Sequence, residues 1–527
     1  MAAELGGGAF LSSFINALFD TLSNDEFVNW IRGKKLDQNL LGRLKNILNV
    51  VEAVLSDAEK KQITEDAVKR WLNDLQDAVY DADTCWMNDS LSKLLEACDN
   101  LQHARTLLNI NAGTGHDSSQ KIDPCRLLAQ LKRVRVLSFE FFPLDDNSWP
   151  DPIGDLIHLR YLDLSDTPIV TLPESMSNLY NLQTLKLRKC RGLKKLPSKM
   201  QDLVNLRHLD ITATNLEEMP KGMSKLKKLQ MLSDYIVGKH EENGIGELGE
   251  LVNLQGSFRI EKLENVADSS EAWKARMVDK KYITHLRLSW SLYEESEVCD
   301  SHTEKDVLEK LRPHKDLKEL SIWGYRGTMF PDWVGPSSYH NMTELHLREC
   351  RNCWVLPSLG QLPSLEKLFI EDFDKVKKID ESFYKGDGTH QHQETPFRSL
   401  KYLTIQKLPC WEEWESYECD DDDDAPFPKL EWLGILNCPK LRGDLPTFLP
   451  SLEQLNIRGC EEIACYLPRA PTMRELRIDG NQEARMRELP LSVLEKVEIN
   501  GEQLVNSPFE AMTHTQPTSC WIFFSPL

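Results

Sequence analysis

The stretches LIHLRYLDL at 156–164, LYNLQTLKL at 179–187 and LVNLRHLDI at 203–211 share one template, L-x-x-L-x-x-L-x-L. The same template reads LKRVRVLSF at 131–139 and LKKLQMLSD at 226–234, so its third hydrophobic residue recurs every 23 to 25 residues. One such repeat cannot bury its own apolar edge. We therefore expect neighbouring repeats to stack into a curved solenoid, which is an architecture for binding.

The template returns less regularly in the second half of the chain, with insertions between its copies. Its third hydrophobic residues there are Leu286, Leu320, Leu345, Leu368, Leu403, Leu433, Leu455, Leu476 and Val497. A period in the twenties with this spacing is typical of a leucine-rich repeat. We therefore predict an α/β fold whose main part is a leucine-rich-repeat solenoid, a horseshoe with parallel β-strands on its concave face.

Residues 1–84 follow a helical period instead. Apolar residues recur at i, i+3 and i+4 in three stripes, over 10–22, 40–55 and 68–82. Three amphipathic helices joined by short polar links predict an N-terminal α-helical bundle.

The changes of period along the chain suggest domain boundaries. We expect a helical coiled-coil domain at 1–84, a junction at 85–130, a first block of repeats at 131–235, an irregular insertion with a helix on the convex side at 236–285, a second block of repeats at 286–505, and a tail without repeats at 506–527.

Charge, hydropathy and cysteine placement exclude several classes of protein. A formal net charge of −20 argues against general nucleic-acid binding. No apolar run approaches the roughly 18 residues that span a bilayer, so we expect no integral membrane association. Four of the thirteen cysteines, Cys190, Cys350, Cys438 and Cys460, follow a strand where the repeat turns a small polar side chain inward. This structural use of cysteine fits a reducing, cytoplasmic compartment.

Motifs for catalysis, cofactors and metals are weak or missing. The phosphate-binding loop G-x-x-x-x-G-K-S/T does not occur, because the Gly-Lys pairs at 33–34 and 238–239 lack the Ser or Thr that follows the lysine. Cys350 and Cys353 form a lone C-x-x-C pair, whereas structural zinc needs four ligands. We therefore expect no enzyme, no cofactor and no metal.

The residues that flank the inward leucines of each strand should lie on the concave face, because side chains alternate along a strand. Exposed aromatic and arginine residues are common anchors of protein interfaces. The alternative is that some of them only pack against neighbouring coils. We predict a protein-binding face made of Tyr161, Asp163, Lys186, Arg188, His208, Asp210, Trp323, His346, Arg348, Phe369, Trp432, Arg458 and Arg477.

The local charge balance is uneven. Between Tyr180 and Gln230 the chain holds twelve Lys or Arg and four Asp or Glu. The third helical stripe is acidic instead, with four aspartates between residues 74 and 83. These two regions could dock on each other, or they could be two solvated faces that never meet, since exposed ion pairs contribute only ~0–1 kcal/mol each.

Two parts of the chain resemble one family. The stretch from RGKKLDQNL at 32–40 to VYDAD at 79–83 is similar to the Rx-type N-terminal coiled-coil domain of plant nucleotide-binding leucine-rich-repeat disease-resistance receptors. The repeats that begin with LRYLDLSDTPIVTLP at 159–173 resemble those of the same receptors. The family places a nucleotide-binding domain between these parts. Here the helical motif ends at Asp83 and repeats begin a few dozen residues later, so the resemblance implies a receptor without its nucleotide switch.

The resemblance also implies an intramolecular contact and a set of partners. In the family an acidic motif of the helical domain docks on basic residues of the repeats. The resemblance therefore implies that Asp77, Asp81 and Asp83 contact a basic surface of the repeats. Its members are Lys186, Arg188 and Arg207.

The implied function is a non-catalytic, defence-related recognition or adaptor protein. Its repeats would bind a pathogen effector, a host protein or a full-length receptor, and its helical domain would bind a signalling partner. A general leucine-rich-repeat scaffold unconnected with immunity, a decoy and a pseudogene product remain alternatives. An extracellular receptor domain fits less well, because the N-terminus has no basic segment of the kind that begins a signal peptide.

Overall fold

The computed structural model describes residues 106–108, 124–140, 149–291, 301–335, 339–385, 395–415, 417, 425–442, 444–463, 466–479, 485–486, 494–499 and 502–504. The chain divides into two compact units, Met1–Cys190 and Arg191–Leu527. The predicted helical bundle at 1–84 lies outside the described residues, and so do the tail at 506–527 and most of the predicted junction at 85–130.

The first unit contains the beginning of the repeat array. Its elements are β1 (Thr106–Leu108), α6 (Pro124–Gln130), β2 (Val136–Ser138), the 3-10 helix η2 (Asp151–Asp155), β3 (Tyr161–Asp163), η3 (Glu174–Asn178) and β4 (Thr184–Lys186). The four strands are parallel, and Leu137, Leu162 and Leu185 lie opposite one another in adjacent strands. All three leucines are fully buried, so the predicted template sets the register of this sheet.

The second unit continues with longer strands. Its elements in chain order are η4 (Met200–Asp202), β5 (His208–Asp210), η5 (Met223–Lys225), β6 (Met231–Leu232), β7 (Asp234–Ile236), η6 (Glu241–Asn243), η7 (Ile245–Glu250), β8 (Gln255–Glu261), η8 (Leu263–Asn265), α7 (Ser269–Lys274), η9 (Met277–Asp279), β9 (Tyr282–Ser289), α8 (Ser301–Lys310), β10 (Glu319–Trp323), η10 (Asp332–Val334), β11 (Glu344–Arg348), β12 (Lys367–Glu371), β13 (Lys378–Ile379), η11 (Glu381–Phe383), β14 (Tyr402–Gln406), β15 (Glu413–Trp414), β16 (Trp432–Leu436), β17 (Gln454–Arg458), β18 (Tyr466–Leu467), β19 (Glu475–Ile478), β20 (Arg485–Met486), β21 (Lys496–Ile499) and β22 (Glu502–Leu504).

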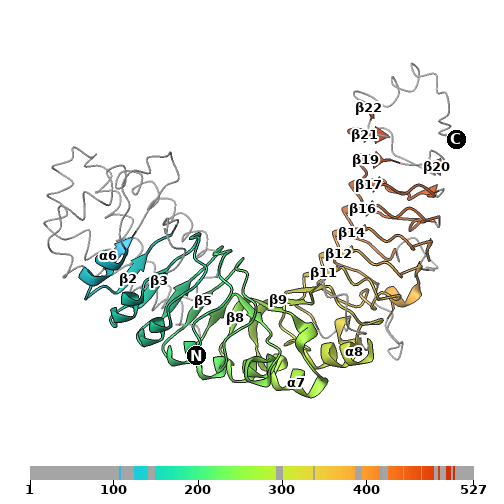
Figure 1. The fold of residues 1–527 in the computed structure, drawn as a ribbon. Coiled ribbons are helices and arrows are strands. Elements are labelled where there is room, and N and C mark those ends of the chain that lie inside the picture. Colours follow the sequence, from blue (N-terminus) through green and yellow to red (C-terminus); the bar gives the residue numbers. More distant parts are fainter. Residues whose placement is uncertain are drawn as a thin grey trace, which may run out of the picture. The chain divides into compact units, whose positions relative to one another are not determined.

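The strands of the second unit follow the predicted register. A sheet runs from β7 through β8, β9, β10, β11, β12, β14, β16, β17 and β19 to β21, with every pairing parallel, and β22 adds an antiparallel edge. The hydrophobic residues predicted from Leu286 to Val497 stand opposite one another in successive strands. Figure 1 shows this unit curving with its strands on the inner side and α7 and α8 on the outer side. The leucine-rich-repeat solenoid is thus confirmed for the described residues.

At least nine strands of the two main sheets are followed by a turn through a left-handed residue. In the first unit this residue is Asp166 or Lys189, with φ near 55° and 58°. In the second unit the same turn uses Ala213, Gly324, Glu349, Asp372, Lys407, Asn437 and Gly459. Glycine adopts this conformation without strain, whereas other residues are held there by the surrounding structure. The repeat therefore stores a little backbone strain at each coil.

The residue after this turn is the small polar group that the sequence places inward. The thiol of Cys190 donates to the carbonyl of Leu164 one coil earlier, at 3.0 Å. Cys460 does the same to Ile435 at 3.7 Å. Both thiols are fully buried, which confirms a structural use for these cysteines.

The segment 236–285, expected to be an irregular insertion, carries part of the sheet. Strand β8 pairs with β7 on one side and with β9 on the other, with a shift of register between Gly256 and Ser257. Phe258 and Ile260 fill the inward positions that leucines hold elsewhere. Backbone hydrogen bonds do not depend on the type of side chain, and any apolar residue at the inward positions can bury that face of the sheet. The sheet therefore continues where the leucine template stops.

The helix expected on the convex side within 236–285 is α7, which has six residues. The Asp268 carboxylate begins it by accepting hydrogen bonds from the backbone amides of Ser270 and Glu271. Among the described residues, none of the helices has the length and apolar character that crossing a bilayer requires.

Candidate protein-binding face

The outward-pointing residues of strands β9 to β19, on the inner side of the second unit, form what we call the concave face. Because the strands pair in register, these residues line up in rows that cross the sheet. One row contains Ser321, His346, Phe369 and Thr404, one from each successive strand. His346 and Phe369, both predicted to lie on this face, are therefore neighbours in one row.

His346 and Phe369 stack on each other across β11 and β12. Their ring centroids lie 4.4 Å apart with an interplanar angle of 7°. The carboxylate of Glu344 lies 2.8 Å from Nε2 of His346 and accepts a hydrogen bond from Lys367 at 3.0 Å. Burial raises the pKa of Glu344, but these two hydrogen bonds outweigh burial and leave the pKa below its ordinary value. The stack is therefore held in place before any ligand arrives.

Arg348 lies at the end of β11 within a network of acids and bases. Its Nε atom is 3.2 Å from Glu371 and 3.4 Å from Glu349. Lys407 reaches the same Glu371 at 2.9 Å and raises its own pKa by doing so. The guanidinium is half-buried by this network, and it can still offer its other N–H groups to a ligand.

Trp323 brings aromatic area to the same part of the face. Two guanidinium groups lie over its ring, that of Arg287 at 3.9 Å and that of Arg348 at 5.1 Å from the centroid. Such cation–π contacts contribute about 0.5–2 kcal/mol each. The ring is half-buried, so one part of it supports the arginines and another part faces solvent.

The distal part of the face holds the remaining predicted residues of this unit. Arg458 makes an ion pair with Glu498 at 2.8 Å, and Arg477 pairs with Glu475 at 3.2 Å. Trp432 is half-buried, and its indole lies beside Gly434, where an added Cβ would come within 3.2 Å of Nε1. The glycine stands in the row between Thr404 and Asn456.

The predicted residues of β3 to β5 are less available than those of β10 to β17. In the first unit the hydroxyl of Tyr161 donates to Asp163 at 2.9 Å, and Lys186 lies 3.8 Å from the same carboxylate. Asp163 is only 6% exposed, so it supports the sheet and offers little to a ligand, in contrast to its expected exposure. Arg188 is exposed.

In the second unit, His208 and Asp210 of β5 are half-buried. A carboxylate oxygen of Asp210 already accepts the amide of Thr212 at 3.0 Å, so this pair is partly engaged in local structure.

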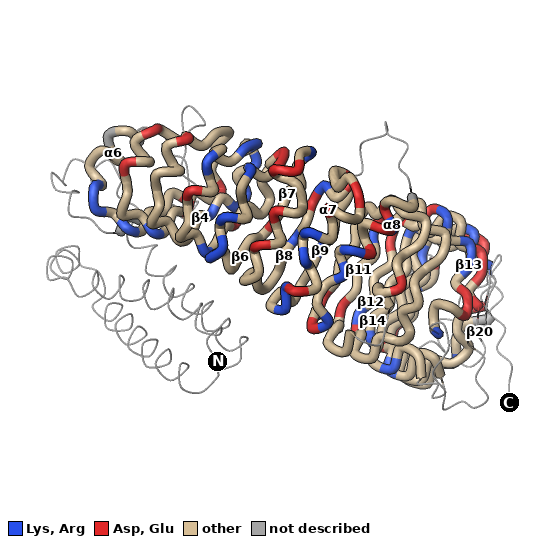
Figure 2. The backbone as a smooth tube through the Cα atoms, turned by 90° about the horizontal axis from the view of Figure 1, so that it is seen from below, with Lys and Arg blue, Asp and Glu red and all other residues tan. Residues whose placement is uncertain are grey.

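The predicted docking of the acidic motif on the basic repeats stays a prediction. Asp77, Asp81 and Asp83 lie outside the described residues. Within each unit, several lysines of the basic stretch are already paired with an acid of a neighbouring coil, namely Lys186–Asp163, Lys189–Asp166, Lys194–Glu217, Lys221–Glu242 and Lys227–Glu250. Figure 2 shows acidic and basic segments interspersed along the coils of the second unit. The net positive charge of the stretch is partly neutralised by this arrangement.

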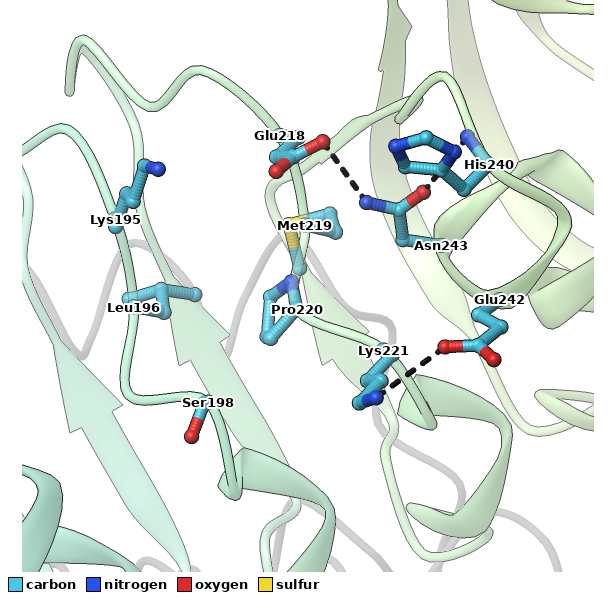
Figure 3. Close-up of a pocket in the computed structure, with 10 residues that line it drawn as sticks. All are labelled: Lys195, Leu196, Ser198, Glu218, Met219, Pro220, Lys221, His240, Glu242 and Asn243. Atoms are coloured by element: carbon cyan, nitrogen blue, oxygen red, sulfur yellow. Dashed lines mark hydrogen bonds and ion pairs between the residues drawn. The ribbon is translucent and has the colours of Figure 1, made fainter.

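A surface hollow of about 520 Å³ lies beside three successive coils of the second unit. Its floor is made by Leu196, Met219 and Pro220, and its rim is polar (Figure 3). On the rim, the amide of Asn243 donates to Glu218 at 2.9 Å, and Lys221 pairs with Glu242 at 3.3 Å. The rim groups largely satisfy one another, and the ten lining residues hold no pairing of a nucleophile with a general base.

The lone C-x-x-C pair is buried and structural. The thiol of Cys353 donates to the carbonyl of Gly327 at 3.2 Å, and burial raises the pKa of both Cys350 and Cys353 above that of an ordinary thiol. A metal ligand must be a thiolate, which this environment disfavours. No group of three or more His, Cys, Asp or Glu side chains is placed to hold a metal within the described ranges.

Two residues of the face escaped the sequence analysis. Arg287 lies between the inward Leu286 and Leu288, and Tyr402 immediately precedes the inward Leu403 and is 40% exposed. They hold the same positions in their strands as His346 and Trp432 do in theirs. The offset from the inward leucine was the signal that could have found both.

Comparisons with known proteins follow the same two-part organisation. Residues 10–88 match the model of the Rx N-terminal domain, residues 158–179 match a leucine-rich repeat, and residues 245–373 match the R13L1/DRL21 leucine-rich repeats. The matched N-terminal domain thus ends 70 residues before the first matched repeat begins (158 − 88).

The related proteins are named for disease resistance in plants. One from Arabidopsis thaliana is 41% identical over 68% of this chain and 25% of its own length. An RPP13-like protein from the same plant is 42% identical over 64% of this chain and 32% of its own length. The chain therefore spans about a quarter to a third of the relatives it matches.

Among solved structures, a leucine-rich-repeat protein of Leptospira interrogans is 19% identical, with a TM-score of 0.38 over 63% of this chain and 80% of that one. The resemblance seen in the sequence is confirmed by the family models and the plant relatives. The chain is thus a relative of plant disease resistance proteins that combines an Rx N-terminal domain with leucine-rich repeats.

Proposed function

We propose that this chain is a non-catalytic recognition protein of plant defence, which binds a pathogen effector or a host protein through the concave face. The relatives carry disease resistance in their names, and this supports the defence setting. We propose in addition that the N-terminal domain binds a signalling partner and that the protein acts in the cytoplasm. A general scaffold unconnected with immunity is the alternative that the relatives disfavour.

The observation that carries the proposal is the half-exposed aromatic and arginine content of β9 to β17. Trp323, Phe369, Tyr402 and Trp432 all lie on one face of one sheet. Aromatic residues supply large contact area with few rotatable bonds, so burying them against a partner loses little conformational entropy. Ion pairs and ring stacking already hold several of them, which makes the face preorganised for binding.

The test is affinity capture with the full chain from infected and uninfected leaf extracts. Tyr402→Glu combined with Trp432→Glu adds two charges to the concave face. Trp273→Glu is the matched control, because Trp273 is 62% exposed on α7 at the outer side of the unit. We expect one or more proteins to bind the natural chain and the control but not the double variant.

Captured proteins should then bind the purified chain directly with the same dependence on the two variants. Identical capture by all three chains would contradict a role for the concave face. The defence setting is tested separately, by comparing infection of plants that carry the natural gene, the double variant or no gene. Equal susceptibility of all three would contradict it.

A further inference from the structure

Arg287 differs from the neighbouring arginines of the concave face. Arg259 lies 2.6 Å from Asp234, Arg348 lies 3.2 Å from Glu371, and each therefore has a carboxylate partner. Arg287 has no carboxylate oxygen within 4.0 Å among the described residues. Its guanidinium instead lies over Trp323, with the central carbon 3.9 Å from the ring centroid. It is half-buried, and burial together with the nearby Arg259 lowers its pKa.

Three N–H donors gather around this arginine without acceptors. The Nε atom of Arg287, the Nε1 atom of Trp323 and the Nε atom of Arg348 are all buried, and none has a hydrogen-bond acceptor in the described part of the chain. Arg348 Nε approaches Glu371, but the two groups are not aligned for a hydrogen bond. A buried donor without an acceptor is unfavourable, so three of them at one place favour a ligand that supplies acceptors.

The three side chains come from adjacent strands and converge. Arg287 of β9 stands opposite Ser321 of β10, and Trp323 of β10 stands opposite Arg348 of β11. Both guanidinium groups then lie over the one indole, within 5.1 Å of its centroid. Two positive charges share this ring. Glu349 and Glu371 approach Arg348, whereas the carboxylates that act on Arg287, namely Glu319, Glu261 and Asp234, do so from a greater distance and leave it without a direct pair.

We propose that Arg287, Trp323 and Arg348 form a subsite for an Asp or Glu side chain of a protein partner. The proposal rests on the proposed function, since it names the chemistry that a partner of the concave face presents here. A carboxylate would accept from Arg287 in the forked geometry that guanidinium groups prefer, and it would relieve the repulsion between two cations. In the same sheet, carboxylates of the chain already pair with Arg259 of β8, Arg458 of β17 and Arg477 of β19.

The test measures binding of a fluorescein-labelled peptide of alternating Glu and Ser, with an amidated C-terminus, to the full chain by fluorescence anisotropy at low salt. Replacing every Glu by Gln gives the matched control peptide. We expect the acidic peptide to bind and the Gln peptide not to bind. Arg287→Ala should weaken binding at least about tenfold, the change expected when one charged hydrogen bond is lost. Arg287→Lys should restore part of the affinity, because lysine keeps the charge but not the fork.

Arg474→Ala is the matched control variant, because Arg474 precedes β19, away from the subsite. Its guanidinium pairs with Glu495 at a distance of 3.8 Å. It should bind the acidic peptide as the natural chain does. Circular dichroism and thermal unfolding show that each variant is folded. Absence of binding by the natural chain, or equal binding by Arg287→Ala and the natural chain, would overturn the proposal.

A further variant identifies an acid that comes from the chain itself. Residues 292–300 follow β9 in the sequence and include Glu294, Glu295 and Glu297. If changing these three to Gln raises peptide affinity, the chain supplies its own acid and a partner's side chain is the wrong occupant. The peptide measurement needs no natural partner, so it can fail while leaf proteins still bind through Tyr402 and Trp432. It can also succeed when that capture fails.

Discussion

The regular repeats of the first unit and the irregular repeats of the second unit use the same inward leucines and differ in what they present outward. Strands β2, β3 and β4 have three residues each, and their outward Ser138, Asp163 and Thr184 are buried. Strands β10, β11, β12, β14, β16 and β17 have five residues each and expose parts of Trp323, Phe369 and other large side chains. In these strands the regular repeats turn several buried polar side chains outward, whereas the irregular repeats turn large, partly exposed side chains outward.

The two regions also differ in how they fill the space behind the strands. Among the described residues of the first unit, Phe139 and Trp149 form a tilted aromatic pair with ring centroids 4.7 Å apart. In the second unit an aromatic cluster joins several coils, because Phe427 contacts Phe397 at 5.0 Å, Tyr384 at 5.8 Å and Trp414 at 6.2 Å. Insertions lengthen the coils there, and rings fill the larger interior.

The largest effect is expected from Phe427→Ala. This ring is fully buried within the cluster, so its removal should lower the free energy of unfolding by about 3–5 kcal/mol. Phe139→Ala in the first unit removes a ring that contacts one described ring, Trp149, and should fall at the lower end of that range. Urea unfolding of the full chain, followed by tryptophan fluorescence, measures both changes. A larger effect at Phe139 than at Phe427 would contradict the importance of the cluster.

A second prediction concerns Lys280, which ends η9 in the same backbone conformation in which Leu251 ends η7 in the preceding coil. It is 1% exposed, and its ammonium group donates to the carbonyls of Leu248 and Leu251 at 2.7 and 3.2 Å. Burial lowers the pKa of Lys280 to about 8, against 10.5 for an ordinary lysine. Between these pH values the unfolded chain holds a proton that the folded chain has released. Raising the pH through this window therefore favours folding.

The size of this pH effect is limited by the pKa difference to about 3 kcal/mol. We expect the stability of the natural chain, relative to that of Lys280→Met, to rise from pH 8 to pH 10.5. The variant has no titrating group at this position, so the difference between the two removes the contributions of other groups. Parallel pH profiles from chemical unfolding would show that the buried lysine titrates normally.

A third prediction tests how closely the irregular coils approach one another. A Cβ at Gly360 would lie 2.3 Å from the backbone oxygen of Tyr384 in the next coil, so Gly360→Ala should destabilise the second unit by about 1–3 kcal/mol. Gly434→Ala is the control, because there the nearest atom is Nε1 of Trp432, a side-chain atom at 3.2 Å. In thermal unfolding, the melting temperature of Gly360→Ala should be well below that of Gly434→Ala. Equal melting temperatures would show that the coils can move apart.

The smallest expected effect comes from the left-handed turn shared by both kinds of repeat. Ala213 has φ of 59°, a conformation that an alanine adopts with strain. Ala213→Gly should therefore stabilise the chain by somewhat less than about 1 kcal/mol, after the extra entropy of glycine in the unfolded chain is subtracted. Ala272→Gly in α7 should have the opposite sign, since glycine weakens a helix by about 1 kcal/mol. A destabilising Ala213→Gly would show that the turn is not strained.

The fold could be predicted where a regular spacing of apolar residues determines which side chains are buried. The spacing of Leu162 and Leu185 in the first unit, and of Leu345 and Leu368 in the second, was enough to place them opposite each other in adjacent strands. The segment with β8 was harder, because Phe258 and Ile260 keep the inward pattern without the leucine wording. A search for apolar alternation, independent of residue type, would have found it.

The candidate site was predictable in position and not in pairing. His346 and Phe369 were placed on the concave face by their offset from leucines, yet nothing in the chain order says that they stack. Asp163 had the same offset and turned out to be engaged by Tyr161 and Lys186. Exposure depends on neighbours from other coils, which lie more than twenty residues away in the sequence.

The apolar period by itself determined a stacked, parallel-stranded architecture, because burial of one edge of every repeat is a local requirement that each repeat satisfies in the same way. Only the tertiary structure decided that Arg287 lies over Trp323 with no carboxylate oxygen of the described residues within 4.0 Å, while Arg259 and Arg348 each have a carboxylate. The physical reason is that charge pairing is a competition among side chains from several strands. Its outcome depends on distances of a few ångströms that no single repeat encodes.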